Sequence, residues 1–120
     1  MSSKVSDRAV PAQCPPRLSI DPESMREHAD DATRLLKALS NSSRLMVLCS
    51  LAQGELTVGQ LNERVPLSQS ALSQHLAVLR RDGLVRTRRS AQTIYYSLAV
   101  GPAGRLIETL HEIFCGENSA

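Results

Sequence analysis

Aromatic residues are scarce in this sequence, which contains no Trp, one Phe and two Tyr among 120 residues. So few aromatic side chains argue against a stacking platform for single-stranded nucleic acid. Long apolar runs are also missing, and none approaches the roughly 20 residues needed to span a membrane. The N-terminal stretch MSSKVSDRAVPAQCPP lacks the apolar segment of a signal peptide. We therefore expect a cytoplasmic protein that does not associate with a membrane.

Cysteine occurs only three times, which is an odd number. Without a secretory signal, this count argues against a structural disulfide framework, and we expect the thiols to be reduced at rest. Any function of a cysteine is then reactive, regulatory or metal-binding. The length and the 42% hydrophobic content suit one compact domain.

Positive charge is concentrated in one part of the chain, although the formal net charge is only +2. Residues 66–100 carry five Arg against the single acid Asp82, whereas acids and bases cancel over residues 1–65. This distribution suits the electrostatic footprint of a protein that binds nucleic acid. A solvated basic face is the alternative interpretation of the charge alone.

The first 22 residues hold four of the six prolines and few large apolar side chains. Such a segment cannot bury enough surface to offset the entropy cost of ordering, so we predict a disordered arm over residues 1–22. We predict one folded domain over residues 23–116 and a short tail over residues 117–120.

Apolar residues at helical spacing, together with capping residues, predict five helices and one hairpin. The hairpin is predicted from the β-like runs LVRTRR and TIYYSL, which flank Ser90-Ala91-Gln92. Glu55-Leu56 suggests a further short strand. The predicted fold is mainly α with a small β-hairpin wing, in the order α-α-α-α-β-β-α, and it is a winged helix-turn-helix. The helices are expected from Glu23 to Ser40, from Ser42 to about Gln53, from Thr57 to Val65, from Ser68 to Asp82, and from Pro102 to about Gly116.

The fourth predicted helix has a polar face of small and hydrogen-bonding residues without an acid. A helix of this kind fits the major groove, where residues near its N-terminus reach base edges and basic groups hold phosphates. The Arg-rich hairpin would lie along phosphates or enter the minor groove. The predicted DNA-contacting residues are Gln69, Ser70, Ser73, Gln74, His75 and Arg80 on the helix, and Arg86, Arg88 and Arg89 on the wing.

Two stretches of the chain resemble the ArsR family of bacterial winged-helix repressors. They are LLKALSNSSRLMVLCSLAQGELTVGQL and LSQSALSQHLAVLRRDGLVRTRRSAQTIYYSL, and the resemblance extends over about residues 25–115. The family implies a homodimer built on the first and last helices. It also implies that two recognition helices meet successive major grooves of a near-palindromic operator, and that an inducer weakens the binding of DNA.

Metal sensing is poorly supported by a comparison with the sensor sites of the family. Thr57 and Gly59 stand where arsenic or cadmium sensors have a Cys-x-Cys pair. The last predicted helix offers Glu108, His111 and Glu112 but lacks the Asp-x-His of zinc sensors. Soft metals need several converging thiolates or imidazoles, so we expect neither a metal site nor another cofactor.

Cys49 and Cys115 resemble in their separation and local sequence the dithiol persulfide sensors of the BigR and SqrR branch of the family. By that resemblance, persulfides or polysulfides link the two cysteines, release the operator and derepress sulfide-handling genes. Peroxide or general oxidants acting through the same thiols are an alternative, and both cysteines could also be core or surface residues without function. Cys14, in the predicted arm, has no assigned role.

A small thiol enzyme using Cys115 and His111 is a further alternative. Cysteine catalysis needs an oriented base, an oxyanion site and a substrate cleft. A chain of this length, already committed to helices and a wing, leaves little room for them, so we expect no enzymatic activity.

Overall fold

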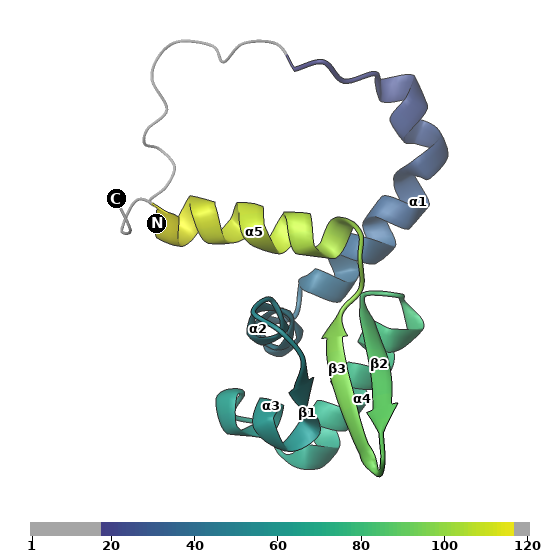
Figure 1. The fold of residues 1–120 in the computed structure, drawn as a ribbon. Coiled ribbons are helices and arrows are strands. Elements are labelled where there is room, and N and C mark those ends of the chain that lie inside the picture. Colours follow the sequence, from purple (N-terminus) through teal and green to yellow (C-terminus); the bar gives the residue numbers. More distant parts are fainter. Residues whose placement is uncertain (1–17, 117–120) are drawn as a thin grey trace.

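The computed structural model describes residues 18–116 of the chain. Most of the predicted arm, including Cys14, and the whole predicted tail lie outside the described residues. The elements follow the predicted order of helices and hairpin, with one short additional strand (Figure 1). No helix within the described residues is long and apolar enough to cross a membrane. The elements are α1 (Pro22–Leu39), α2 (Ser42–Leu51), β1 (Leu56–Thr57), α3 (Val58–Arg64), α4 (Gln69–Arg81), β2 (Val85–Ser90), β3 (Thr93–Leu98) and α5 (Pro102–Cys115).

The helices begin where the sequence predicts capping residues. The Asp21 carboxylate accepts a hydrogen bond from the Glu23 backbone N–H at 3.1 Å, with Pro22 in the first helical position of α1. The Ser68 hydroxyl accepts from the Ala71 backbone N–H at 3.1 Å at the start of α4. Each of these bonds satisfies a donor that has no partner inside its helix.

The three strands form one antiparallel sheet in the order β1-β3-β2. β2 pairs with β3 along its whole length, from Val85 opposite Leu98 to Ser90 opposite Thr93. The hairpin is therefore a regular ribbon, and β1 covers only part of the outer edge of β3.

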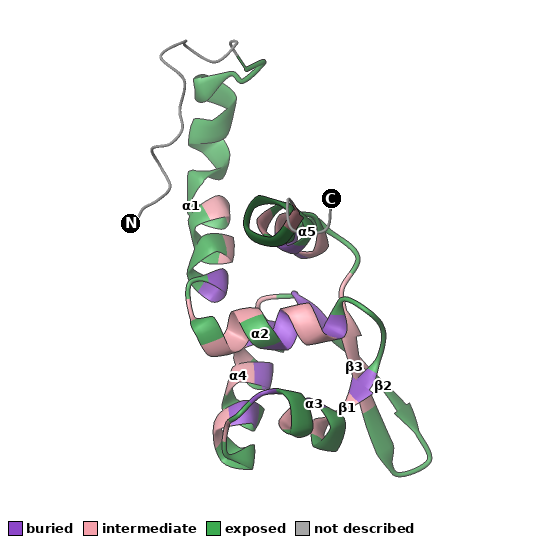
Figure 2. Ribbon diagram, turned by 90° about the vertical axis from the view of Figure 1, so that its left-hand side faces the viewer, coloured by how far each residue is buried: buried purple, intermediate pink, exposed green. Residues whose placement is uncertain are grey.

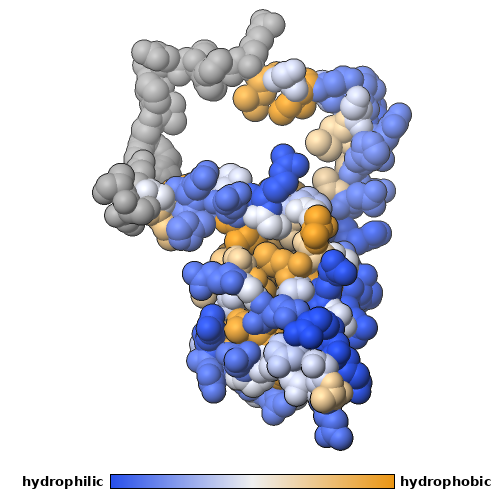
Figure 3. Space-filling model, in the orientation of Figure 1, coloured by the Kyte–Doolittle hydropathy of each residue, from blue (hydrophilic) through white to orange (hydrophobic). Residues whose placement is uncertain are grey.

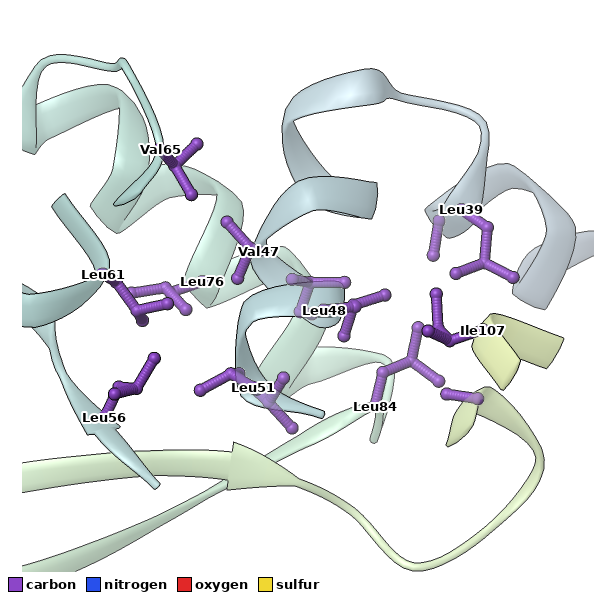
Figure 4. Close-up of a cluster of buried hydrophobic side chains, with 14 of the residues drawn as sticks. Leu39, Val47, Leu48, Leu51, Leu56, Leu61, Val65, Leu76, Leu84 and Ile107 are labelled. Atoms are coloured by element: carbon purple, nitrogen blue, oxygen red, sulfur yellow. The ribbon is translucent and has the colours of Figure 1, made fainter. Parts of the chain in front are cut away.

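A core of hydrophobic side chains joins the helices to the sheet (Figure 4). Among the described residues, no buried side chain is polar or charged. Leu48 of α2 is fully buried, and the core continues to α5 through Leu84 and Ile107. The core therefore fixes α4 and the hairpin in one rigid arrangement with α2 and α5.

The second helix differs from its prediction in one detail. It ends at Leu51 rather than near Gln53, and Ala52 in the following turn is exposed. Val47, Leu48 and Leu51 are buried, and Cys49 is partly buried against the core. The buried surface of α2 is wide because the helix packs against other helices on several sides and against β3.

The outer parts of α1 and α5 carry apolar side chains that the described chain does not cover. Only the C-terminal end of α1 is buried, at Ala38 and Leu39, and the rest of the helix projects from the other elements (Figure 2). Met25 and Leu36 of α1 are 51% and 59% exposed. Ile113 and Phe114 of α5 are likewise exposed. These two helices therefore present an apolar surface without a partner inside the described residues.

Candidate nucleic-acid interface and cysteine pair

Helices α3 and α4 form a helix-turn-helix whose turn is fixed by side chains. The Thr57 hydroxyl and the Gln60 side chain form a reciprocal capping box at the start of α3. The Asn62 amide donates to the Leu67 carbonyl at 2.7 Å, and Ser68 then caps α4. The start of the second helix is thus held in a defined position relative to the first.

The two faces of α4 differ as predicted. Leu72, Leu76 and Leu79 are buried in the core, and the opposite face is exposed. The surface over α3, α4 and the wing is largely hydrophilic (Figure 3). His75 is half-buried, so its surroundings differ from those of the other predicted contact residues. The exposed predicted residues of α4 are Gln69, Ser70, Ser73, Gln74 and Arg80.

A groove of about 450 Å³ separates α4 from β3. It brings the predicted residues Ser73 and Arg80 to the same place as Tyr96 of the wing, for which the sequence predicted no role. The sequence shows that Tyr96 belongs to an alternating strand of the basic hairpin. Alternation does not tell whether its face of the strand packs against the core or against the edge of a helix. The groove is lined by Ser73, Leu76, Ala77, Arg80, Arg81 and Tyr96.

The three arginines of the wing do not share one face. Side chains alternate along a strand, and Val85 at the start of β2 is buried. Arg89 lies on the same face of the strand as Val85, whereas Arg86 and Arg88 lie on the other face. The wing therefore directs its positive charge to both sides of the sheet.

Arg88 is held in place by two neighbours. Its Nε and Nη2 atoms each donate to the Glu55 carboxylate at 2.9 Å, and its guanidinium lies 4.6 Å from the centre of the Tyr95 ring. The hydrogen bonds from Arg88 lower the pKa of Glu55, and the same bonds raise the pKa of Arg88. Sequence reasoning missed Glu55, because no spacing rule links two residues that are 33 positions apart.

Cys49 and Cys115 lie on two different helices of the described chain. Cys49 lies on α2, half-buried against the core, and Cys115 lies at the end of α5, exposed. Burial raises the pKa of the Cys49 thiol, and the negative charge of a Cys115 thiolate raises it further. The second effect places the two thiols within the range of a charge–charge interaction.

A groove of about 380 Å³ lies beside Cys49, between α2 and α5. Its polar side chains are Gln53, Glu108 and His111, and its walls are otherwise apolar. No group of three or more His, Cys, Asp or Glu within residues 18–116 is arranged to hold a metal ion. The groove gives small molecules a route to Cys49.

Comparisons with known proteins agree on one family. Residues 41–87 match the bacterial regulatory proteins of the arsR family. The transcriptional activator HlyU of Vibrio cholerae is 51% identical over 96 residues, which are 80% of this chain and 89% of HlyU.

Solved structures give the same result. The transcriptional repressor BigR of Xylella fastidiosa superposes with a TM-score of 0.75 at 42% identity, over 80% of this chain and 98% of BigR. A homodimeric winged helix-turn-helix domain of Mycobacterium bovis superposes with a TM-score of 0.67 at 29% identity, over 80% of this chain and 89% of that domain. The relatives are DNA-binding transcriptional regulators rather than enzymes. The chain belongs to the ArsR family of bacterial transcriptional regulators, with BigR and HlyU among its close homologues.

Proposed function

We propose that the protein is a homodimeric repressor that binds operator DNA while Cys49 and Cys115 are reduced. Persulfides or polysulfides link the two cysteines, the operator is released, and genes for handling sulfide are derepressed. The observation that supports this proposal most is the groove between α2 and α5 that Cys49 lines, with Cys115 at the exposed end of α5. Burial and, to a smaller extent, the charge of Cys115 raise the pKa of Cys49. BigR, a close homologue, is a repressor by name.

The DNA-binding half of the proposal is supported by the exposed polar face of α4 and by its groove with the wing. Side-chain amides and hydroxyls near the start of a recognition helix can read base edges, and guanidinium groups can neutralise phosphates. The proposed DNA contacts are Gln69, Ser70, Ser73, Gln74 and Arg80 of α4 and Arg86 and Arg89 of the wing.

The dimeric half is supported by the uncovered apolar surface of α1 and α5. A two-fold axis through this surface would bury the same residues on both copies. It would also leave both copies of α4 free, because α1 and α5 lie at the opposite end of the molecule from α3 and the hairpin tip (Figure 2). The homodimeric relative from Mycobacterium bovis supports this arrangement.

The chemistry of release starts at Cys115, because it is the exposed thiol and Cys49 is half-buried with a raised pKa. The Cys115 thiolate attacks the outer sulfur of a persulfide R–S–SH, and the thiolate R–S⁻ leaves. The Cys49 thiolate then attacks the Sγ atom of Cys115, the bond from Sγ to the outer sulfur breaks, and the outer sulfur leaves as hydrosulfide. Two thiols are oxidised to a disulfide and one sulfane sulfur is reduced. A further sulfur transfer before ring closure would leave additional sulfur in the bridge.

Peroxide is the second candidate inducer, favoured by the exposure of Cys115. Peroxide would oxidise the Cys115 thiolate to a sulfenic acid, and condensation with Cys49 would release water and give a plain disulfide. The two inducers would therefore act on the same residues and differ in the sulfur content of the product.

The proposal is tested by fluorescence anisotropy on a DNA duplex that the reduced protein has selected from a random-sequence library. We expect glutathione persulfide to release the duplex from the wild-type protein and to leave the Cys49→Ser and Cys115→Ser proteins bound. Both variants should bind the duplex as tightly as the reduced wild type. Release of the Cys49→Ser protein by persulfide would contradict the dithiol mechanism, and failure to select any duplex would contradict operator binding.

A further inference from the structure

The short strand β1 pairs with only part of the wing. β1 has two residues, and they pair with β3 at Leu56–Tyr96 and Thr57–Tyr95. Beyond Tyr95, toward the hairpin tip, no strand within residues 18–116 pairs with the outer edge of β3. The orientation of the hairpin tip relative to the rest of the domain therefore depends on β2 and β3 themselves and on the side-chain contacts near Tyr95.

The Glu55–Arg88 ion pair lies at the level of Tyr95. Arg88 is directly opposite Tyr95 in the β2–β3 register, and Thr57 is opposite Tyr95 on the other side. Glu55 precedes Thr57 by two positions and therefore projects from the same face of the sheet. Its hydrogen bonds to Arg88 cross over β3 and join β2 to the segment before β1, which are not neighbours in the sheet.

The geometry of the pair is restrictive. A planar guanidinium that donates two parallel hydrogen bonds to one carboxylate has a fixed orientation, and the Tyr95 ring at 4.6 Å stacks against it. The side chains remain 54% exposed for Arg88 and 39% for Glu55, so the pair contributes through its position more than through burial.

We propose that Glu55 is a positioning residue of the wing: it anchors Arg88 over Tyr95 and so fixes the angle at which the hairpin meets DNA. Arg88 then connects β2 to the segment before β1 and does not make the phosphate contact that the sequence predicts for it. The phosphate contacts of the wing are made by Arg86 and Arg89. The inference rests on the proposed binding of an operator through α4 and the wing.

The direction in which Glu55→Gln changes the affinity for DNA distinguishes a positioning role from a purely electrostatic one. A carboxylate near a phosphate backbone opposes binding, so its neutralisation should tighten binding if charge is its only contribution. If Glu55 positions the wing, Glu55→Gln should instead weaken binding. Because no phosphate contact is lost, the dependence of log Kd on log salt concentration should keep its slope.

The experiment measures binding of wild type, Glu55→Gln, Arg88→Gln and the double variant to the selected duplex over a series of salt concentrations. We expect each single variant to bind about threefold more weakly with an unchanged slope, and the double variant to bind no more weakly than either. The charge-swapped protein, Glu55→Arg with Arg88→Glu, should recover most of the affinity. Glu63→Gln on α3 is the control for loss of one negative charge and should not weaken binding.

A second readout does not involve DNA. Amide hydrogen exchange of the hairpin should accelerate in Glu55→Gln, while exchange in α4 stays as in the wild type. Tighter binding of Glu55→Gln, or a slope reduced by about 0.9 in Arg88→Gln as for a lost phosphate contact, would overturn the inference. If the wild-type protein selects no duplex, the proposed function fails, and the inference fails with it.

Discussion

Cys49 and Cys115 are linked electrostatically: burial raises the pKa of the Cys49 thiol on α2, and the negative charge of a Cys115 thiolate at the end of α5 raises it further. The two thiols therefore differ, because Cys115 is exposed and Cys49 is half-buried with a raised pKa.

The reactivity of Cys49 should follow this shift. Because the thiolate is the reactive form, alkylation of Cys49 by iodoacetamide should have its pH midpoint above the ordinary thiol value of 9.0. Cys115→Ser should lower the midpoint without bringing it to 9.0, since burial remains. The raised pKa also affects stability. It contributes to the stability of the folded protein at pH values below the pKa of Cys49 in the unfolded chain, and this contribution is lost as the pH rises through the pKa of Cys49 in the folded protein. Peptide mass spectrometry measures the midpoint, and a value at or below 9.0 would contradict the account.

Arg80 should behave as a phosphate contact. Arg80→Gln should weaken binding to selected and unrelated duplexes alike and reduce the slope of log Kd against log salt by about 0.9. Arg105→Gln on α5 removes the same charge at the other end of the fold and should leave the slope unchanged. Anisotropy titrations measure both, and equal slopes for Arg80→Gln and wild type would remove Arg80 from the interface.

Phe114 should belong to the dimer interface, because it is 74% exposed on α5 beside other uncovered apolar residues. Phe114→Asp should dissociate the dimer and, with it, weaken operator binding by more than tenfold, since each half-site then binds separately. Sedimentation velocity measures the mass directly. A variant that sediments as a dimer would place the interface elsewhere.

Leu48 should contribute strongly to stability, because it is fully buried among the helices. Leu48→Ala removes that packing and should cost about 2–5 kcal/mol of unfolding free energy. Val100→Ala, at a position 93% exposed, should change it by less than about 0.5 kcal/mol. Urea unfolding followed by circular dichroism compares the two, and similar losses for both would contradict the described core.

Local signals were sufficient to predict most of the fold. The caps at Asp21, Thr57 and Ser68 act over two or three positions, and the alternating runs of the hairpin act over six residues, so both can be recognised in a sequence. The same is true of the leucine stripe on α4. The turn at Ala91, where φ is 56°, contains no glycine and could be predicted only from the strands on either side of it.

Non-local relationships were beyond the sequence. The pairing of Glu55 with Arg88 depends on how β1 docks against β3, and the place of Tyr96 in a groove depends on the packing of α4 beside the sheet. The exposed apolar residues of α1 and α5 follow the same helical spacing as residues of core helices, so spacing alone did not show that the described chain leaves them uncovered. The pairing of Cys49 with Cys115 is predicted only by the resemblance to a family.

The central claim is that Cys49 and Cys115 form a reactive-sulfur switch, and mass spectrometry of the reduced protein after exposure to glutathione persulfide tests it most directly, with peroxide as a parallel sample. The account predicts a Cys49–Cys115 crosslink after persulfide, retaining extra sulfur where transfer precedes ring closure, and little change after peroxide. A plain disulfide formed readily by peroxide would identify a general redox switch instead. No crosslink in either sample would contradict the account and return both cysteines to a structural role.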